Sequence, residues 1–151
     1  MRAVIQRVKR ASVSVDGKIV SSIEEGLLVL LCVCEDDTDR DLEYLTKKIA
    51  HMRIFSDENG KFNLSVKDIG GSCLIISQIT LAADTKKGNR PSYFYAAEPQ
   101  KAQQLYQRFA ELMQNKHNIP TKTGVFAAHM EVNLLNDGPV TIYIDSKENL
   151  Q

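Results

Sequence analysis

Small polar residues that could contact a substrate gather in "SQIT", Ser77 to Thr80, which interrupts an apolar run. A threonine hydroxyl and backbone N–H groups at this place could face a substrate carbonyl and stabilise negative charge that develops on its oxygen. The pattern fits equally a strand end with one face in water, which is the more frequent origin of such a stretch. An unassisted Thr80 hydroxyl is a weak nucleophile, and no histidine or carboxylate within the stretch could act as its base.

A second candidate stretch is "NDGPVT", residues 136–141, which lies between two runs typical of strands. Asn136, Asp137 and Gly138 are ordinary turn residues. Pro139 removes a hydrogen-bond donor just where a strand should begin, and an X-Pro bond is the one peptide in which the cis form has a low energy. The stretch is therefore either a hairpin corner or a place where the Gly-Pro peptide contacts something else.

A third stretch, the basic loop "KKGNRP", carries Lys86, Lys87 and Arg90 around Gly88. Such a loop is most often simply solvated, but cations around a glycine could also hold a phosphate group. Composition does not decide between these two interpretations.

Several large enzyme classes are excluded by missing motifs: G-x-S-x-G, the P-loop, G-x-G-x-x-G and H-E-x-x-H are all absent. The three histidines, His51, His117 and His129, are scattered and have no metal partner at ligand spacing. We therefore expect no metal site and no cofactor. His129 falls on the polar face of its predicted strand, so we expect a solvated surface histidine.

The composition describes an ordinary globular chain: of 151 residues, 43% are hydrophobic and 25% charged. The 19 basic and 19 acidic residues cancel, which excludes a strongly basic nucleic-acid binder and leaves only a local patch for RNA. The odd count of three cysteines argues against a disulfide framework. The longest apolar run, "LLVLLCVC", is too short to span a bilayer, and no apolar stretch of signal-peptide length precedes it, so we expect a cytoplasmic protein.

The elements that position these stretches follow from hydrophobic periodicity. Residues 2–9 and 11–15 alternate as strand, Asp16-Gly17 predicts a hairpin into "KIVSSIEEG", and "GLLVLLCVCE" predicts a central strand covered on both faces. Thr38 and Asp41 resemble a capping box. They open a predicted helix with one apolar face, formed by Leu42, Leu45, Ile49 and Met52.

The second half of the chain continues the pattern. "RIFSDENGKFNLSV" predicts a hairpin at Asn59-Gly60, "SCLIISQITLAAD" predicts a strand, and Pro99 suits the first turn of a second helix. "GVFAAHMEVNLLN" alternates as a strand and "VTIYID" closes the sheet. We predict a single α+β domain, residues 1–151, with a mostly antiparallel, barrel-like sheet core and two packed helices.

Two of these stretches together resemble the signature motifs of a known family. "SQITLAAD" and "NDGPVT" are similar to the two motifs of the D-aminoacyl-tRNA deacylases, editing enzymes of the D-tyrosyl-tRNA deacylase type. "MRAVIQRVKRASVSVDG", "RIFSDENGKFNLSV", "GNRPS" and "TGVFAAHMEV" also resemble that family, so the likeness runs from Met1 to about Asp145. One departure is Ile79, where the commoner family form has phenylalanine; the change alters the pocket wall but leaves the backbone N–H in place.

The resemblance implies a homodimeric cytoplasmic hydrolase. It would cleave the ester between a D-amino acid and the terminal adenosine of a tRNA, and would also remove glycine mischarged on alanine tRNA. In the family the Gly-Pro peptide is cis and reaches across the dimer into the partner's pocket. Carried onto Gly138 and Pro139, this arrangement would set two fixed carbonyl oxygens against an L side chain, whereas a D side chain turns away and glycine has none.

The resemblance also implies how the ester is cleaved. The backbone N–H groups of Ser77, Gln78, Ile79 and Thr80 would supply the oxyanion site, and Gln78 and Thr80 would line the pocket. The 2′-hydroxyl of the terminal ribose would help to activate the water, so that the RNA contributes part of the catalysis.

The remaining candidate residues would contact the RNA or the partner subunit. Phe126 and Ala127 would flank the adenine, because unpaired bases are commonly held by stacking on an aromatic ring. Arg7 would pin the partner's Gly-Pro segment, and Arg90 with its neighbouring lysines would contact phosphate.

Three alternatives remain open at the level of sequence. Thr80 could be the nucleophile of a conventional esterase that acts on the same substrates through an acyl-enzyme. The chain could instead be a non-catalytic RNA-binding module on the same fold. The Gly138–Pro139 peptide could be trans, the commoner form of X-Pro bonds, and its two oxygens would then diverge.

Overall fold

The computed structural model describes residues 1–150. Gln151, the last residue of the predicted domain, lies outside the described residues.

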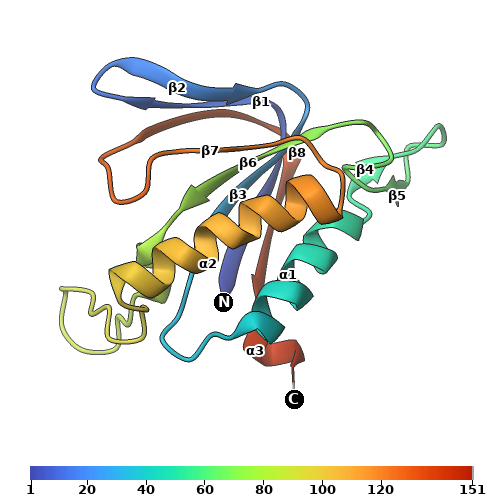
Figure 1. Ribbon diagram of the computed structural model, residues 1–151. Coiled ribbons are helices and arrows are strands. Elements are labelled where there is room, and N and C mark those ends of the chain that lie inside the picture. The colour runs from blue at the N-terminus through green and yellow to red at the C-terminus, as the bar shows by residue number, and fades with distance from the viewer. Residues whose placement is uncertain (151) are drawn as a thin grey trace.

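A long first strand, β1 (Arg2–Val15), organises the sheet (Figure 1). One edge of β1 pairs antiparallel with β3 (Gly26–Cys32) over its first half and with β2 (Lys18–Ile23) over its second half. The other edge pairs antiparallel with β8 (Glu131–Asp145) along most of its length. The two neighbouring strand segments expected from the sequence are therefore one continuous strand.

Two parallel pairings extend this sheet: β6 (Ser72–Ser77) lies beside β3, and β7 (Thr121–Thr123) lies beside β6. Helix α1 (Asp39–His51) connects β3 to β6, and helix α2 (Pro99–Glu111) connects β6 to β7. Parallel neighbours need such long crossovers, because a tight turn can join only antiparallel strands. The sheet is mixed, and the α+β single-domain fold is confirmed.

The sheet curls into a nearly closed barrel. Its path runs from β2 through β1, β3 and β6 to β7, and the Ser21 hydroxyl of β2 donates a hydrogen bond of 2.6 Å to the Thr123 carbonyl of β7. The two ends of the path therefore meet. Helices α1 and α2 lie together against one side of the barrel (Figure 1).

Both main helices begin where the sequence predicted. In α1 the Thr38 side chain accepts from the Arg40 N–H, and the Asp41 carboxylate accepts from the Thr38 N–H at 2.9 Å, which completes the capping box. Helix α2 has Pro99 at its first turn and continues into a π-helical turn, η2 (Leu112–Lys116).

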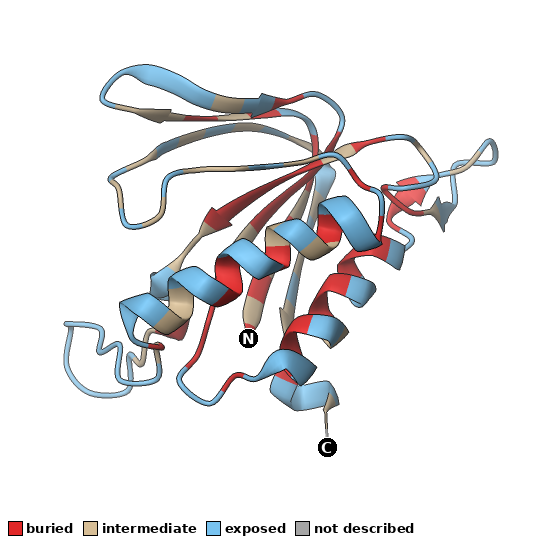
Figure 2. Ribbon diagram, viewed as in Figure 1, coloured by how far each residue is buried: buried red, intermediate tan, exposed pale blue. Residues whose placement is uncertain are grey.

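The core has two parts, one on each face of β3. Leu27, Val29 and Leu31 pack under the two helices, whereas Leu28 faces the inside of the barrel. Figure 2 shows the buried residues concentrated on the central strands and on the inner faces of both helices. This burial on both faces confirms the covered central strand that the sequence predicted.

Three short elements complete the chain. The predicted hairpin forms as β4 (Phe55–Ser56) and β5 (Phe62–Leu64), joined through a turn that includes Gly60. Helix α3 (Ser146–Asn149) follows β8 and packs beside α1.

The strand predicted for "SCLIISQITLAAD" is too long. β6 ends at Ser77, and the chain enters a 3₁₀ turn, η1 (Ile79–Ala82). The partner strand β3 ends at Cys32, and the last ladder-like bond joins the Gln78 N–H to the Leu31 carbonyl at 2.8 Å. Without a strand to pair with, the backbone turns on itself instead.

The strand predicted for "GVFAAHMEVNLLN" begins late, at Glu131. Before it, the Ala128 N–H bonds to the Val125 carbonyl at 3.2 Å, and Ala127 has a φ of +66°. The alternation of side chains predicted for this stretch nevertheless survives in the burial pattern, which alternates from Val125 to Leu135.

The stretch "NDGPVT" is not a hairpin corner, because β8 runs through it without a break. Gln6 pairs with Thr141 and Val8 with Asn136, so four residues of β8, 137–140, lie opposite Arg7 alone. This is a large β-bulge, which pushes the extra residues out of the sheet.

Candidate active site

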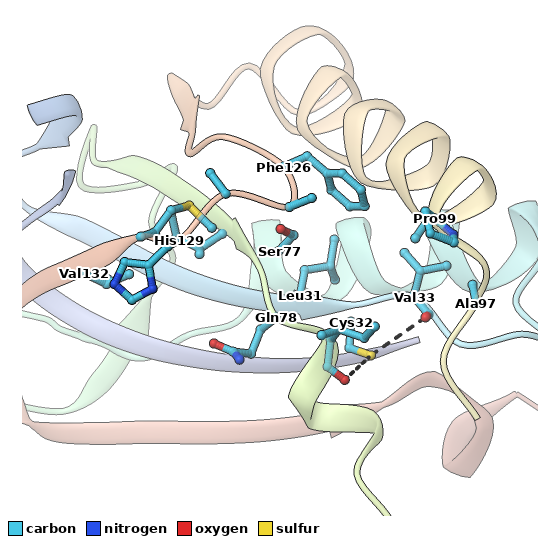
Figure 3. Close-up of a pocket in the computed structure, with 16 residues that line it drawn as sticks. Leu31, Cys32, Val33, Ser77, Gln78, Ala97, Pro99, Phe126, His129 and Val132 are labelled. Atoms are coloured by element: carbon cyan, nitrogen blue, oxygen red, sulfur yellow. Dashed lines mark hydrogen bonds between the residues drawn. The ribbon is translucent and has the colours of Figure 1, made fainter. Parts of the chain in front are cut away.

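A pocket of about 430 Å³ opens where β6 ends, between η1, the start of α2 and the segment that leads into β8 (Figure 3). Five of the residues predicted for the site line it: Ser77, Gln78, Ile79, Phe126 and Ala127. Stretches almost fifty positions apart in the sequence therefore form one site.

The polar side of the pocket is built by the turn from β6 into η1. The Gln78 side-chain amide donates a hydrogen bond to the Thr80 hydroxyl, and the Gln78 carbonyl accepts from the Leu81 N–H at 3.3 Å. Ile79 and Thr80 are the first residues of η1, and the first N–H groups of a helical turn have no acceptor within the turn. This edge of the pocket can therefore offer N–H donors to a ligand oxygen.

Thr80 itself is exposed and is not among the residues that line the pocket, although its hydroxyl is hydrogen-bonded to the side chain of the lining residue Gln78. Ile79 lines the pocket while its side chain is 57% exposed. Ile79 thus lies at the pocket mouth rather than in the core.

The opposite wall is aromatic. The ring of Phe126 packs against Tyr106 of α2, with centroids 5.9 Å apart and planes tilted by 41°. The Tyr106 hydroxyl donates to the Ile75 carbonyl at 2.9 Å, which ties this wall to β6. Phe126 is therefore held in place by the core and presents its ring at the pocket (Figure 3).

The thiol of Cys32 also lines the pocket, close to the carbonyls of Val33 at 3.8 Å and Ile79 at 3.7 Å. A hydrogen bond with the Cys34 thiol, together with burial, raises the pKa of Cys32. The Cys32 thiol therefore stays protonated near neutral pH and is a poor nucleophile. All three cysteines are free, as predicted.

His129 lines the same pocket, at its exposed rim (Figure 3). The alternating pattern predicted a solvated surface histidine and gave no sign of this position. Among the described lining residues it is the only histidine or carboxylate. The pocket interior is otherwise apolar apart from the turn at Ser77 and Gln78.

Further wall residues were also missed: Leu31, Val33, Ile76, Ala97, Ala102, Ala128, Met130 and Val132. Their apolar side chains look like ordinary core residues in the sequence. The one feature of the sequence that could have indicated this wall is Pro99, which marks the start of α2 and lies at the pocket edge.

The Gly138–Pro139 peptide lies away from this pocket. It is cis, and both residues are exposed at the bulge in β8. Asn136 stabilises the bulge from inside, because its side-chain oxygen accepts from the Val140 N–H at 2.9 Å and its amide donates to Thr141 at 3.0 Å.

Arg7 holds this bulge in its own chain. Its Nε donates to the Asp137 carbonyl at 2.9 Å, and its Nη1 donates to the Ile54 carbonyl at 2.8 Å. The Asp137 carboxylate lies 3.6 Å from the same guanidinium, which also stacks over the Phe62 ring at 5.2 Å. The buried Arg7 thus anchors the residue that precedes Gly138.

Arg90 belongs to an exposed loop between η1 and α2 and does not line the pocket. Within residues 1–150, no group of three or more histidine, cysteine or acidic side chains is placed to hold a metal ion. Over the same described range, no helix is long and apolar enough to cross a membrane.

Fold and pocket together define a single-domain protein with a surface pocket in which an aromatic wall faces a turn with available N–H donors. Such a site can hold a flat ring on one side and a carbonyl oxygen on the other.

Comparisons with known proteins specify the family. The family model described as "D-Tyr-tRNA(Tyr) deacylase" matches residues 4–145. A "D-aminoacyl-tRNA deacylase" of Persephonella marina is 59% identical over 147 residues, which cover 97% of this chain and 99% of that protein. The protein of the same name from Thermosipho africanus is 56% identical over 148 residues, with 98% and 99% covered. This chain belongs to the D-aminoacyl-tRNA deacylase family, which confirms the predicted family and enzyme class.

Solved structures agree on the fold. A structure named "c-Myc DNA Unwinding Element Binding Protein" superposes with a TM-score of 0.90 at 40% identity, covering 96% of this chain and 98% of that one. A "probable eukaryotic D-amino acid tRNA deacylase" superposes with a TM-score of 0.84, covering 95% and 97%. The second likeness, at 16% identity, concerns the fold alone.

Proposed function

We propose that this chain hydrolyses the ester of D-aminoacyl-tRNA, and that of glycine mischarged on alanine tRNA, while it rejects L-aminoacyl-tRNA. The observation that carries the proposal is the convergence of Ser77, Gln78 and Ile79 with Phe126 and Ala127 on one pocket. The Phe126 ring suits the terminal adenine of a tRNA, and the N–H groups at the start of η1 suit the oxyanion of the ester.

In this proposal the tRNA's own terminal 2′-hydroxyl helps to activate the attacking water. Two features support it. The Thr80 hydroxyl already accepts a hydrogen bond from the Gln78 amide, and an amide cannot take up the proton that a nucleophilic Thr80 would release. His129, the only histidine among the described lining residues, lies at the exposed rim of the pocket.

Rejection of L-residues is assigned to the Gly138–Pro139 segment of the second subunit in a homodimer. The segment is exposed, projects as a bulge and lies outside the pocket of its own chain. These features fit a group that is presented to another molecule. The role of Arg7 is then to fix the segment from within its own subunit, through the bond to the Asp137 carbonyl.

The test is hydrolysis of matched D-Tyr-tRNA and L-Tyr-tRNA by the purified protein, with Thr80→Ala and His129→Asn beside it. We expect the wild type to hydrolyse only the D ester. Both variants should keep this activity to within about tenfold, because neither side chain supplies the base. A substrate whose terminal adenosine lacks the 2′-hydroxyl should be cleaved poorly. Loss of both esters, or of neither, would contradict the proposal.

Two alternative mechanisms have their own signatures in the same assay. A Thr80 nucleophile predicts that Thr80→Ala abolishes turnover and that an acyl-enzyme can be trapped. A His129 base predicts that His129→Asn abolishes it while Thr80→Ala does not.

A second candidate function is a non-catalytic nucleic-acid-binding module. The observation in its favour is the name of the similar structure, which describes a protein that binds a DNA element. Binding of uncharged tRNA without hydrolysis of either ester would favour this candidate. The pocket and its N–H donors favour the hydrolase.

A further inference from the structure

The loop that joins η1 to α2 carries an unusual surface. Within the aromatic–basic loop, which comprises residues 84–96, the run Tyr93, Phe94 and Tyr95 is exposed. Phe94 is 74% exposed, more than any other large apolar side chain among the described residues. Exposed aromatic residues cost free energy in water, so three in succession indicate a surface that contacts a ligand.

The same loop is positively charged. Lys86, Lys87 and Arg90 are all exposed, and none takes part in an ion pair within residues 1–150. The whole chain has a formal net charge of zero. These unpaired cations beside the aromatic run therefore form a local patch on an otherwise balanced surface.

The loop is held in shape by its own backbone. Asp84 and Ser92 exchange two hydrogen bonds, at 2.7 and 2.9 Å, which close the basic part into a small hairpin-like loop. The Tyr95 carbonyl accepts from the Glu35 N–H at 2.9 Å. The Phe94 and Tyr95 rings meet edge to face, with centroids 5.7 Å apart. The aromatic run is thus presented by an ordered loop.

Both ends of the loop are attached to the active-site pocket. It follows η1, whose first residue Ile79 lines the pocket, and it is followed directly by Ala97, which also lines the pocket. Cys34, two residues beyond the lining Cys32, forms a β-bridge with Ala96. In Figure 1 the loop, in yellow, projects beyond the first turn of α2. A chain that leaves the pocket on this side would meet the loop next.

We propose that the aromatic–basic loop binds the unpaired nucleotides that precede the terminal adenosine of the tRNA. Their bases stack on Tyr93, Phe94 and Tyr95, and their phosphates lie near Lys86 and Lys87. Aromatic stacking combined with basic side chains is the general way in which proteins hold single-stranded nucleic acid without reading its sequence. This inference rests on the proposed function for its substrate.

The test compares two substrates that share the reacting ester. One is D-Tyr-tRNA, and the other is D-Tyr esterified to adenosine alone, which has no further nucleotides to reach the loop. We expect Phe94→Ser to lower kcat/KM on the tRNA by about tenfold more than on the adenosine ester, since one stacked base contributes roughly that factor. Ile19→Ser is the control, because Ile19 is a similarly exposed apolar residue on β2, outside the loop.

The charge contribution is tested separately. The double variant Lys86→Gln with Lys87→Gln should make kcat/KM on the tRNA less dependent on salt. In a plot of log kcat/KM against log salt concentration, the slope should become shallower by about 0.7 for each phosphate that the variant no longer neutralises. Equal effects of Phe94→Ser on both substrates would indicate a structural role and would overturn the inference. The inference would also be overturned if Phe94→Ser had the same kcat/KM as the wild type on both substrates.

A direct binding measurement separates this inference from the proposed function. Anisotropy of a labelled, uncharged single-stranded RNA tetramer needs no hydrolysis. If the wild type cleaves no ester but binds the tetramer, and Phe94→Ser weakens that binding about tenfold, the loop inference stands while the proposed function fails. If the tetramer does not bind, or if Phe94→Ser changes the oligomeric mass, the loop is not an RNA platform.

Discussion

At the scale of single residues, Arg7 links the proposed selectivity to the fold. One guanidinium binds the carbonyls of Asp137 and Ile54 and stacks on Phe62, so it joins the bulge in β8 to the β4–β5 hairpin. The ideal Cβ position at Gly138 lies only 3.3 Å from the same guanidinium and 2.8 Å from the Val140 side chain. A side chain at position 138 would therefore collide with its surroundings, which favours glycine there.

We predict that Arg7→Lys reduces the preference for D-Tyr-tRNA over L-Tyr-tRNA by about tenfold, with a smaller change in kcat on the D ester. A lysine carries the charge but cannot donate to two carbonyls in fixed directions or stack on Phe62 in the same way. The ratio of kcat/KM for the two esters measures the effect. An unchanged ratio would show that Arg7 does not position the selective segment.

Ala127 illustrates a residue whose place in the site was predicted but whose conformation was not. The alternating pattern indicated an extended strand, yet Ala127 adopts φ +66° at the pocket edge. An L-residue with a Cβ costs about 1 kcal/mol or more in this region. Strain of this kind is often found at functional sites, where the surrounding structure maintains it.

We expect Ala127→Gly to raise the free energy of unfolding slightly, by about 0.5 kcal/mol, because relief of the left-handed strain outweighs the greater entropy of the unfolded chain. Ala128→Gly is the neighbouring control and should lower it by about 0.5 to 1 kcal/mol. Urea unfolding of both variants gives the comparison. If Ala127→Gly is as destabilising as Ala128→Gly, the conformation at Ala127 carries no strain.

The lining residues show which parts of a site a sequence can reveal. Ser77, Gln78 and Phe126 were found because a polar or aromatic side chain interrupted a pattern or matched a family motif. Leu31 and Val132 were not, since an apolar residue that lines a pocket and one that fills a core have the same local pattern. Only the packing of α2 over the end of β6 distinguishes the two.

At the scale of elements, the parallel pairing of β3 with β6 decides where the pocket forms. Both strands end near the site, at Cys32 and Ser77, and the chain turns into η1 there. The sequence indicated that β3 is covered on both faces, but it did not indicate that β6 is its parallel neighbour. The direction of pairing depends on how the intervening helix packs. The strand predicted for "SCLIISQITLAAD" was too long for a related reason, because a strand continues only as far as the partner strand with which it pairs.

The other end of this pairing depends on one close approach. A Cβ added at Gly26 would lie 1.8 Å from the Ser72 carbonyl oxygen and 2.8 Å from its carbon, both main-chain atoms that cannot rotate away. We predict that Gly26→Ala lowers the free energy of unfolding by about 3 kcal/mol, because β3 and β6 must separate to admit the methyl group.

Gly17→Ala provides the matched control for this prediction. Gly17 has φ +77° and no atom within 4 Å of its added Cβ, so only the backbone conformation opposes the change. We expect a loss of about 1 kcal/mol there. Thermal unfolding of the two variants tests the distinction, and equal losses would show that contact with Ser72 is not the cause at Gly26.

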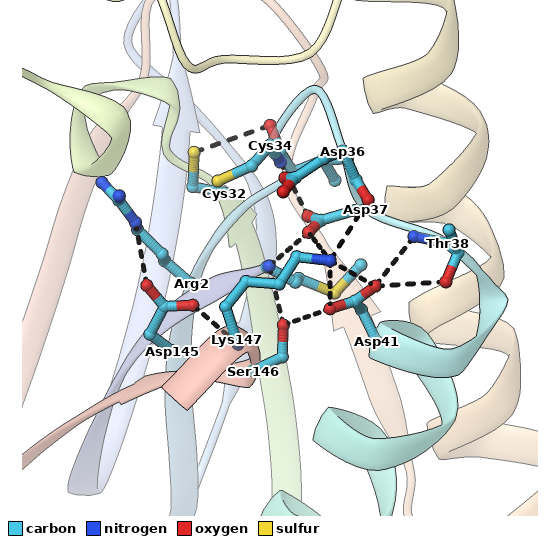
Figure 4. Close-up of polar contacts among 12 residues, drawn as sticks. Arg2, Cys32, Cys34, Asp36, Asp37, Thr38, Asp41, Asp145, Ser146 and Lys147 are labelled. Carbon is cyan, nitrogen blue, oxygen red and sulfur yellow. Dashed lines mark hydrogen bonds and ion pairs between the residues drawn. The ribbon is translucent and has the colours of Figure 1, made fainter. Parts of the chain in front are cut away.

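At the scale of the whole molecule, a buried polar cluster joins the two ends of the described chain to helix α1 (Figure 4). The Met1 ammonium donates to the Ser146 hydroxyl at 2.8 Å and pairs with Asp37 at 2.5 Å. Ser146 in turn donates to Asp41 at 2.6 Å, and Lys147 pairs with Asp41 at 3.0 Å. The sequence predicted only the local bond between Thr38 and Asp41, since most of the others connect residues more than a hundred positions apart.

This cluster should make the stability of the protein sensitive to acid through Asp41. Burial alone would raise the pKa of Asp41, but hydrogen bonds from Ser146, Thr38 and Lys147 outweigh it and lower the pKa far below its ordinary value of 3.8. A carboxylate with a lowered pKa stabilises the folded state above the unfolded pKa, and this contribution is lost as the pH falls through the folded pKa. Below about pH 4 the unfolded state therefore binds more protons at this position than the folded state does.

We predict that the free energy of unfolding of the wild type falls more steeply below about pH 4 than that of Asp41→Asn, which cannot titrate there. The variant should be less stable at pH 7, because it loses the pair with Lys147, and the two curves should converge in acid. Urea unfolding at pH 7, 5 and 3, with each value measured for both proteins, tests the convergence. Burial raises the pKa of the neighbouring Asp37 and so acts in the opposite direction, but it is present in both proteins and largely cancels in the difference. Curves that stay parallel from pH 7 to 3 would show that Asp41 is not an acid-sensitive link between the chain ends and helix α1.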